Sequence, residues 1–372
     1  MKKKILIVYL VAILLGILFV GIHIFKIEFS HKFKFVKPRY EVSQVYSKTV
    51  NNYEADTIWC GTFQLAWNEL MDYVDGNVEF EGVEKFIVNE LNERKFTKDM
   101  VSENSYYVKA EKASKSLKEK INNDLKQKFN IEDGAKILEG QELENSNGII
   151  IYSMLKKEFT FLEKFDDLEG IFFIDEDENY SKVKAFGMDN ESDSKLYDSV
   201  EVLYWDYENL DERAYFISNE FAVKLKTKEN EEVILYRTDK KDSFDNLYNE
   251  LKILSENFEG EKNFSEIDTL TVPCIDIDVN ITYDELCNNI IKNTDGEYIS
   301  KAIQNIKFNL NSEGGLIFSE SAIITDALSA PSLEARYFTF NKPFIIFVKE
   351  VNKEKPYFAM KIETSEYLQV EE

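Results

Sequence analysis

The chain has 372 residues, of which 44% are hydrophobic and 14% aromatic, so it can bury a large core. Its formal net charge of −24 repels phosphate backbones, which argues against nucleic acid as a partner. His23 and His31 are the only histidines, so the body of the chain offers no imidazole to a nucleophile or a transition metal. We therefore expect a protein that is not an enzyme and uses no cofactor.

The first predicted element is an apolar run from Ile5 to Phe25, preceded by three lysines. As a helix its 21 residues would span about 31 Å, the thickness of the hydrocarbon core of a bilayer. A cleaved signal peptide is the alternative, but it needs small residues where this run ends in bulky ones. We expect residues 1–25 to form an uncleaved signal anchor that attaches the protein to a membrane.

Residues 26–58 follow as a stalk, basic at first and then polar, and residues 59–372 as the folded domain. Basic residues flank both ends of the apolar run, so the excess of positive charge does not fix its orientation.

Three helices are predicted in the first part of the domain. Apolar residues at three- and four-residue steps indicate amphipathic helices over Trp59–Val74, Val83–Leu91 and Ser105–Phe129. The third helix is highly charged and is followed by Gly134, a residue type at which helices commonly end.

Short β-rich runs dominate the chain from Gly148 onwards. Two further helices are expected, one over Ser243–Leu251 with Ser243 as its cap, and one that follows Thr282 through Ile290. Helices first and strands afterwards predict an α+β fold with a mixed or antiparallel sheet. The predicted strands cover residues 148–152, 171–174, 200–204, 222–225, 233–236, 306–310, 344–348 and 357–362.

Two other features give weaker signals. The acidic stretch Asp175–Asn179 lacks the turn glycine and closing glutamate of a calcium loop, so we interpret it as a solvated loop. Cys60, Cys274 and Cys287 have no paired spacing, which predicts neither a disulfide framework nor a metal knuckle.

A long irregular stretch between two strands, residues 314–336, is rich in small and polar residues. Loops of this length are usually binding loops or disordered segments. Pattern alone does not decide between the two.

A family resemblance rests on the strands around this loop. Phe340–Phe344 (sequence FNKPF) opens a buried hydrophobic strand, and Pro356–Ala359 opens a second strand near the end of the chain. These motifs resemble the signature of the serpins, the serine protease inhibitors. Weaker matches in the same order include Val272-Pro273 followed by Tyr283 and Leu286, and the pair Phe161 and Phe165. Together they cover about residues 148–363.

The resemblance implies a reactive-centre loop. Asn311–Gly314 resembles the hinge that begins this loop in serpins, so Glu313, Gly314 and Gly315 are the expected hinge residues. The family's spacing from hinge to cleaved bond leads to Leu328–Ser329, and a leucine there suits a chymotrypsin- or elastase-like protease.

The chain also departs from the family. The segment before the strand at Gly148 is several dozen residues short, and the loop carries a bulky Ile317 where inhibitory serpins have a small residue. Two functions stay open. One is inhibition of a serine protease by loop insertion, and the other is a non-inhibitory binding module at the cell surface. In both, the resemblance favours a body that lies outside the cytoplasm.

Overall fold

The computed structural model describes residues 40–43, 56–131, 147–211, 214–316 and 335–371. The predicted anchor at 1–25, most of the predicted stalk and the bond Leu328–Ser329 lie outside these residues. Within the described residues, no helix is long and apolar enough to cross a membrane.

The largest sheet joins strands that are distant in sequence, and all its pairs are antiparallel except β1–β2. Its strands, in spatial order, are β1 (Tyr40–Ser43), β2 (Asp56–Cys60), β19 (Phe358–Ile362), β18 (Phe344–Glu350), β12 (Glu231–Arg237), β11 (Phe221–Lys226) and β8 (Val200–Trp205).

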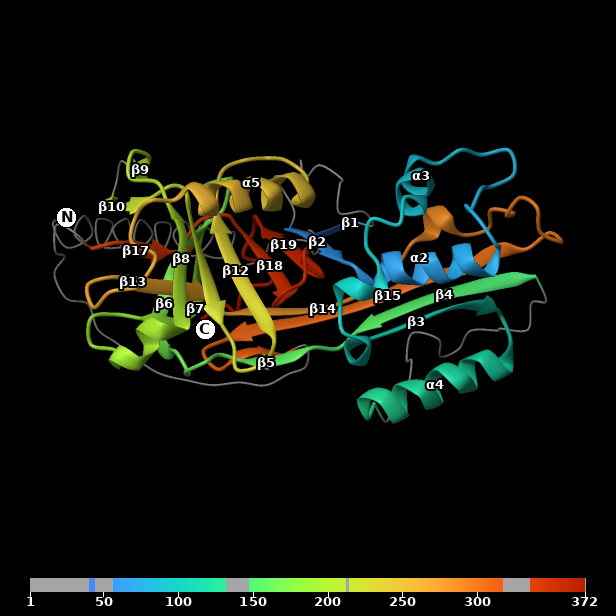
Figure 1. Cartoon of the computed structure of the whole chain (residues 1–372), viewed down its shortest axis with the longest axis horizontal. Coiled ribbons are helices and arrows are strands. Elements are labelled where there is room, and N and C mark those ends of the chain that lie inside the picture. The colour runs from blue at the N-terminus through green and yellow to red at the C-terminus, as the bar shows by residue number, and fades with distance from the viewer. Residues whose placement is uncertain (1–39, 44–55, 132–146, 212–213, 317–334, 372) are drawn as a thin grey trace, which may run out of the picture. The chain divides into compact units, whose positions relative to one another are not determined.

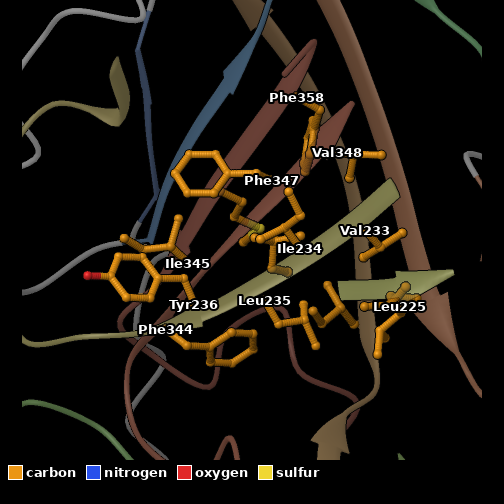
Figure 2. Packing of buried hydrophobic residues seen from close by; sticks show 14 of the residues in the cluster. Leu225, Val233, Ile234, Leu235, Tyr236, Phe344, Ile345, Phe347, Val348 and Phe358 are labelled. Atoms are coloured by element: carbon orange, nitrogen blue, oxygen red, sulfur yellow. The ribbon is translucent and has the colours of Figure 1, made fainter. Parts of the chain in front are cut away.

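Both faces of this sheet are buried, which explains the continuous apolar runs in its central strands. Figure 2 shows the packed side chains of β12 and β18. Phe347 lies on the face covered by helix α5 (Phe244–Asn257), where its ring centroid is 5.2 Å from that of Tyr248. On the other face Phe358 stacks on Phe308 of the second sheet at 4.7 Å. Phe344, Phe347 and Phe358 all belong to one cluster of buried hydrophobic residues.

The second sheet contains β3 (Tyr106–Lys112), β4 (Gly148–Leu155), β15 (Tyr298–Asn311) and β14 (Ile275–Thr282) in that order. Two short strands, β16 (Gly314–Leu316) and β5 (Glu158–Thr160), extend it beyond the end of β4. Helices α2 (Thr62–Tyr73) and α4 (Lys115–Phe129) cover opposite faces (Figure 1). The odd residues Ile149 and Ile151 pack towards α2, and the even residues Ile150 and Tyr152 towards α4.

A third sheet has the order β17 (Tyr337–Thr339), β13 (Thr269–Pro273), β7 (Tyr180–Met188) and β6 (Asp166–Ile174). The described residues also form the pair β9 (Leu210–Asp211) and β10 (Ala214–Ser218), helix α3 (Phe86–Asn92), and 3₁₀ turns at Lys98–Met100, Glu103–Ser105, Ser194–Ser199 and Asp284–Leu286.

The eight predicted strands and the helix capped by Ser243 are confirmed, and the Ser243 hydroxyl accepts the Asn246 backbone N–H at 3.1 Å. Helix α3 lies where the second helix was predicted, although it begins later, at Phe86.

Three of the helix predictions were wrong in extent. Ser105–Lys112 contains no α-helix, because Ser105 ends a 3₁₀ turn and the other seven residues form strand β3 against β4, and the helix begins only at Lys115 after a Ser114 cap. Helix α2 begins at Thr62, since the residues before it form the buried strand β2. Residues 283–290, which follow the end of β14 at Thr282, form a 3₁₀ turn at Asp284–Leu286 and not the predicted α-helix.

The expected border between stalk and domain, at 58 and 59, falls inside strand β2. Strands β1 and β2 place residues 40–43 and 56–58 of the predicted stalk in the large sheet. The sequence signal was weak here because each strand is only four or five residues long.

Candidate functional site

The candidate site lies where β15 leaves its parallel partner β4. The pairing runs from Tyr298 opposite Gly148 to Asn305 opposite Met154. Farther along β15, Asn309–Asn311 pair instead with β16, which turns back antiparallel. The other edge of β16 pairs with β5, the strand that follows β4 in the chain. Strand β16 therefore lies between β15 and β5, in the gap that opens where β15 and β4 separate.

The turn between β15 and β16 is held by specific hydrogen bonds. The Asn311 side-chain oxygen accepts the Glu313 backbone N–H at 3.0 Å, and the Ser312 hydroxyl donates to Asp167 at 2.6 Å. The carbonyl of Glu313 accepts the backbone N–H of Phe161 at 2.9 Å. The side chain of Glu313 stays at the surface, where Lys164 pairs with it at 3.3 Å. The turn is thus fixed by its backbone and by short side chains.

Both glycines of β16 are required by Phe159 on β5. Gly314 has a φ of +152°, and a Cβ on it would lie 2.2 Å from the Phe159 carbonyl oxygen. A Cβ on Gly315 would lie 2.1 Å from the Phe159 ring. A larger residue at Gly314 would meet the backbone of β5, and one at Gly315 would displace the Phe159 ring.

Three packed phenylalanine rings lie beside this turn. The rings of Phe161 and Phe165 are 4.9 Å apart at an angle of 78°, and Phe186 stacks on Phe161 at 5.9 Å. Both Phe161 and Phe165 are fully buried. Edge-to-face and offset contacts of this kind stabilise a core beyond the area they bury.

A buried ion-pair network anchors the segment between β4 and β5. Lys157 contacts Glu231 of β12 and Glu350 of β18, the latter at 2.6 Å, and the side chain of Lys157 is only 10% exposed. Burial acts to raise the pKa of Glu350, but hydrogen bonds from Lys157 and Ser102 outweigh it and hold that pKa below its usual value. The network ties this side of the gap to the large sheet.

The seam between β4 and β15 is held from both faces. Beneath it, the Gln304 amide donates to the Cys60 carbonyl at 3.1 Å and to the Thr62 hydroxyl at 2.9 Å, and accepts from the Tyr283 hydroxyl at 2.6 Å. Above it, α4 packs on Tyr152 of β4 and Ile303 of β15. For a segment to enter between the two strands, their pairing must break and α4 must give way.

Comparisons with known proteins bear on this architecture. No family model and no curated protein matches the chain. The structure of a tumour-suppressing serpin superposes with a TM-score of 0.51 at 11% identity, over 83% of this chain and 92% of that one. This chain has a serpin-like fold.

Two further solved structures are similar at a lower score. Serpin48 of the insect Tenebrio molitor has 11% identity and a TM-score of 0.49, and covers 84% of this chain and 92% of its own. Thyroxine-binding globulin in complex with thyroxine has 10% identity and a TM-score of 0.49, over 83% and 92%.

The serpin-like fold agrees with the predicted resemblance and fold class. Glu313, Gly314 and Gly315 lie together at the turn after β15, and the described chain stops at Leu316. The bond Leu328–Ser329 and Ile317 lie outside the described residues, so the cleavage site and the effect of the bulky Ile317 remain predictions. The acidic stretch Asp175–Asn179 is the β6–β7 turn, closed by Asp175 accepting the Asn179 backbone N–H at 2.8 Å.

Sequence reasoning missed three parts of the site. Phe159 has a partial signal, since it alternates with Thr160 and Phe161 as a strand does. Lys157 and Gln304 give no signal, because their partners come from segments far away in the chain.

Cys60 and Cys274 are buried and Cys287 half-buried, all as free thiols, and burial raises the pKa of Cys274 to about 12.

Proposed function

We propose that this protein inhibits a chymotrypsin- or elastase-like serine protease through a loop cleaved at Leu328–Ser329. The observation that carries the proposal is the position of β16. Its residues Gly314–Leu316 already pair with β15 on one side and with β5 on the other. The loop that follows is therefore connected to a strand that points into the β4–β15 seam.

The proposed reaction begins as ordinary proteolysis. The protease serine attacks the Leu328 carbonyl carbon, the bond to the Ser329 nitrogen breaks, and the protonated amine leaves while Leu328 remains as an ester on the protease. The loop residues after Leu316 then extend β16 between β4 and β15. The new strand supplies the free energy that traps the ester before water can reach it.

A denaturant-resistant complex tests this proposal. After incubation with chymotrypsin, a fraction of the protein should migrate with the protease as a covalent adduct in denaturing electrophoresis. Leu328→Asp should abolish the adduct, because a charged residue does not fit an apolar specificity pocket, and should leave the fold intact. Complete cleavage with no adduct would rule out inhibition by trapping.

The second candidate is a non-inhibitory binding module, and the seam favours it. Entry of the loop must break the β4–β15 backbone pairing and separate Tyr152 from Ile303 beneath α4. If these contacts outweigh the gain from a new strand, the cut loop stays outside and the protein acts only as a substrate.

We also propose that residues 1–25 tether the protein to a membrane with its body outside the cytoplasm. Protease added to intact cells should then release the domain by cutting beyond about Lys26. A soluble mature protein with a new N-terminus would contradict the anchor, and protection of the domain until lysis would contradict the orientation.

A further inference from the structure

Two aromatic side chains near α5 stand between acidic residues in the sequence. Tyr207 lies between Asp206 and Glu208 in the segment after strand β8. Phe258 is the first residue after α5 and has Glu256 and Glu259 close to it in the sequence. Helix α5 packs against β8 (Figure 1), and the two acidic segments meet at the Tyr207 and Phe258 rings.

Three rings gather where these segments meet. The Tyr207 and Phe258 rings are nearly parallel, with centroids 6.4 Å apart and planes at 14°. Tyr204 stands edge-on to Phe258 at 5.9 Å and 70°. A Cβ on Gly260 would lie 2.5 Å from the Phe258 ring and 3.0 Å from the Tyr207 hydroxyl, so glycine is what lets the rings approach. We call these three rings the aromatic cluster.

The cluster is open to solvent. Tyr207 is 57% exposed, while Tyr204 and Phe258 are half-buried and form its base. An exposed aromatic ring forfeits the free energy that burial would supply, so this group is available to a partner.

The electrostatic surroundings are negative. The pKa of Tyr204 is raised, first by burial and then by the charges of Asp206, Glu220 and Glu208. The nearby cations are already engaged: Lys240 pairs with Glu220 and Glu250 at 2.7 Å each, and Lys262 donates to the Ser255 carbonyl at 2.9 Å. Among the residues that the structure describes, no ion pair engages Glu208 or Glu259.

We propose that the aromatic cluster binds a basic segment of a protein partner, with a lysine or arginine side chain seated on the Tyr207 ring. The face of an aromatic ring attracts a cation, and the carboxylates of Glu208 and Glu259 add to this attraction. The cluster is an open surface and not an enclosed pocket, which suits a side chain held by its polypeptide better than a free small molecule. This inference does not depend on the proposed inhibitory function.

A capped hexapeptide of alternating arginine and glycine is a direct probe, with a peptide of the same length that carries citrulline in place of arginine as its neutral control. Calorimetry should detect binding of the arginine peptide only, and the affinity should fall severalfold as salt rises from 50 to 200 mM. Tyr207→Ala should weaken binding about two- to fivefold, whereas Tyr207→Phe, which keeps the ring, should bind like the wild type.

Tyr180 supplies a matched control, because it is 59% exposed against 57% for Tyr207 and lies on β7. Tyr180→Ala should not change the affinity, and Glu208→Gln with Glu259→Gln should lower both the affinity and its salt dependence. The proposal is overturned if the wild type does not bind the arginine peptide, if citrulline serves equally well, or if Tyr207→Ala binds unchanged. Thermal unfolding of each variant separates a loss of binding from a loss of fold.

Discussion

The large sheet and the β4–β15 seam are both buried, but their strands pair in different directions. In β18 every residue from Phe344 to Val348 is at most 1% exposed, and antiparallel partners flank it on both sides. The seam is a parallel pairing, which is slightly less stable per residue, and it buries polar groups. Gln304 is 1% exposed, and the fully buried Ser153 hydroxyl opposite it has no hydrogen-bond partner among the described residues.

This difference in strand pairing bears on which strands of the molecule can separate most easily. The central strands of the large sheet gain most of their stability from burial of apolar side chains on both faces and lose it only when the domain unfolds. The seam is also buried, between α2 and α4, but its pairing is parallel, so we expect it to separate before the antiparallel strands of the large sheet do. The predicted hinge glycines Gly314 and Gly315 lie at the end of this seam, next to the proposed loop.

The largest expected effect belongs to the large sheet. Phe347→Ala should lower the free energy of unfolding by about 3–5 kcal/mol, because it leaves a cavity against Phe244 and Tyr248. Urea unfolding of the purified domain measures this loss. Phe172→Ala, at a ring that is 58% exposed, is the control and should change stability by less than about 0.5 kcal/mol. Equal effects of the two variants would contradict the assignment of the core.

The large sheet also has a pH-sensitive point at Asp56, which is fully buried at the start of β2. Burial is the largest cause and raises the pKa of Asp56 to about 7. It outweighs the hydrogen bonds from the backbone N–H groups of Glu363 and Thr364, at 2.7 and 2.8 Å, which act to lower this pKa. The unfolded chain releases this proton near pH 4. The contribution of Asp56 to stability is therefore complete below about pH 4 and falls by about 1.4 kcal/mol per pH unit until about pH 7.

Asp56→Asn should remove this slope, because the amide oxygen still accepts both N–H groups but no longer ionises. The variant should match the wild type near pH 4 and exceed it in stability at pH 8, as denaturant titrations at several pH values would show. Asp177→Asn, on the exposed β6–β7 turn, is the control and should keep the wild-type slope. A slope that survives in Asp56→Asn would assign the pH dependence to other groups.

A smaller and local effect is expected at the seam. Gly314→Ala places a Cβ against the Phe159 carbonyl in a backbone conformation that disfavours it, so it should cost about 1–3 kcal/mol and release β16 from β5. Limited proteolysis should then cut near residue 314 faster than in the wild type. Gly76→Ala is the matched control, because no atom lies within 4 Å of the new Cβ. Unchanged protection of Gly314→Ala would show that β16 does not depend on that contact.

The sequence predicted those parts of the fold that local pattern determines. Strand β18 was evident from its unbroken apolar run, and α5 from its periodicity and its Ser243 cap. Residues 106–112 were misassigned because Ala110 and Ala113 continue the three- and four-residue spacing of the helix that follows, and only the distant partner β4 makes them a strand. The predicted hinge rests on family resemblance, whereas the contact of Phe159 with Gly314 and Gly315 depends on tertiary packing that no local pattern encodes.

The thermal stability of the intact and the loop-cleaved protein tests the central claim most directly. The domain should be cut at Leu328–Ser329 by chymotrypsin, confirmed by mass, and melted beside the uncut protein. If β16 extends into the seam after cleavage, a new strand joins the sheet and the cleaved form should melt at a sharply higher temperature. A cleaved form that melts at the same or a lower temperature would contradict loop insertion.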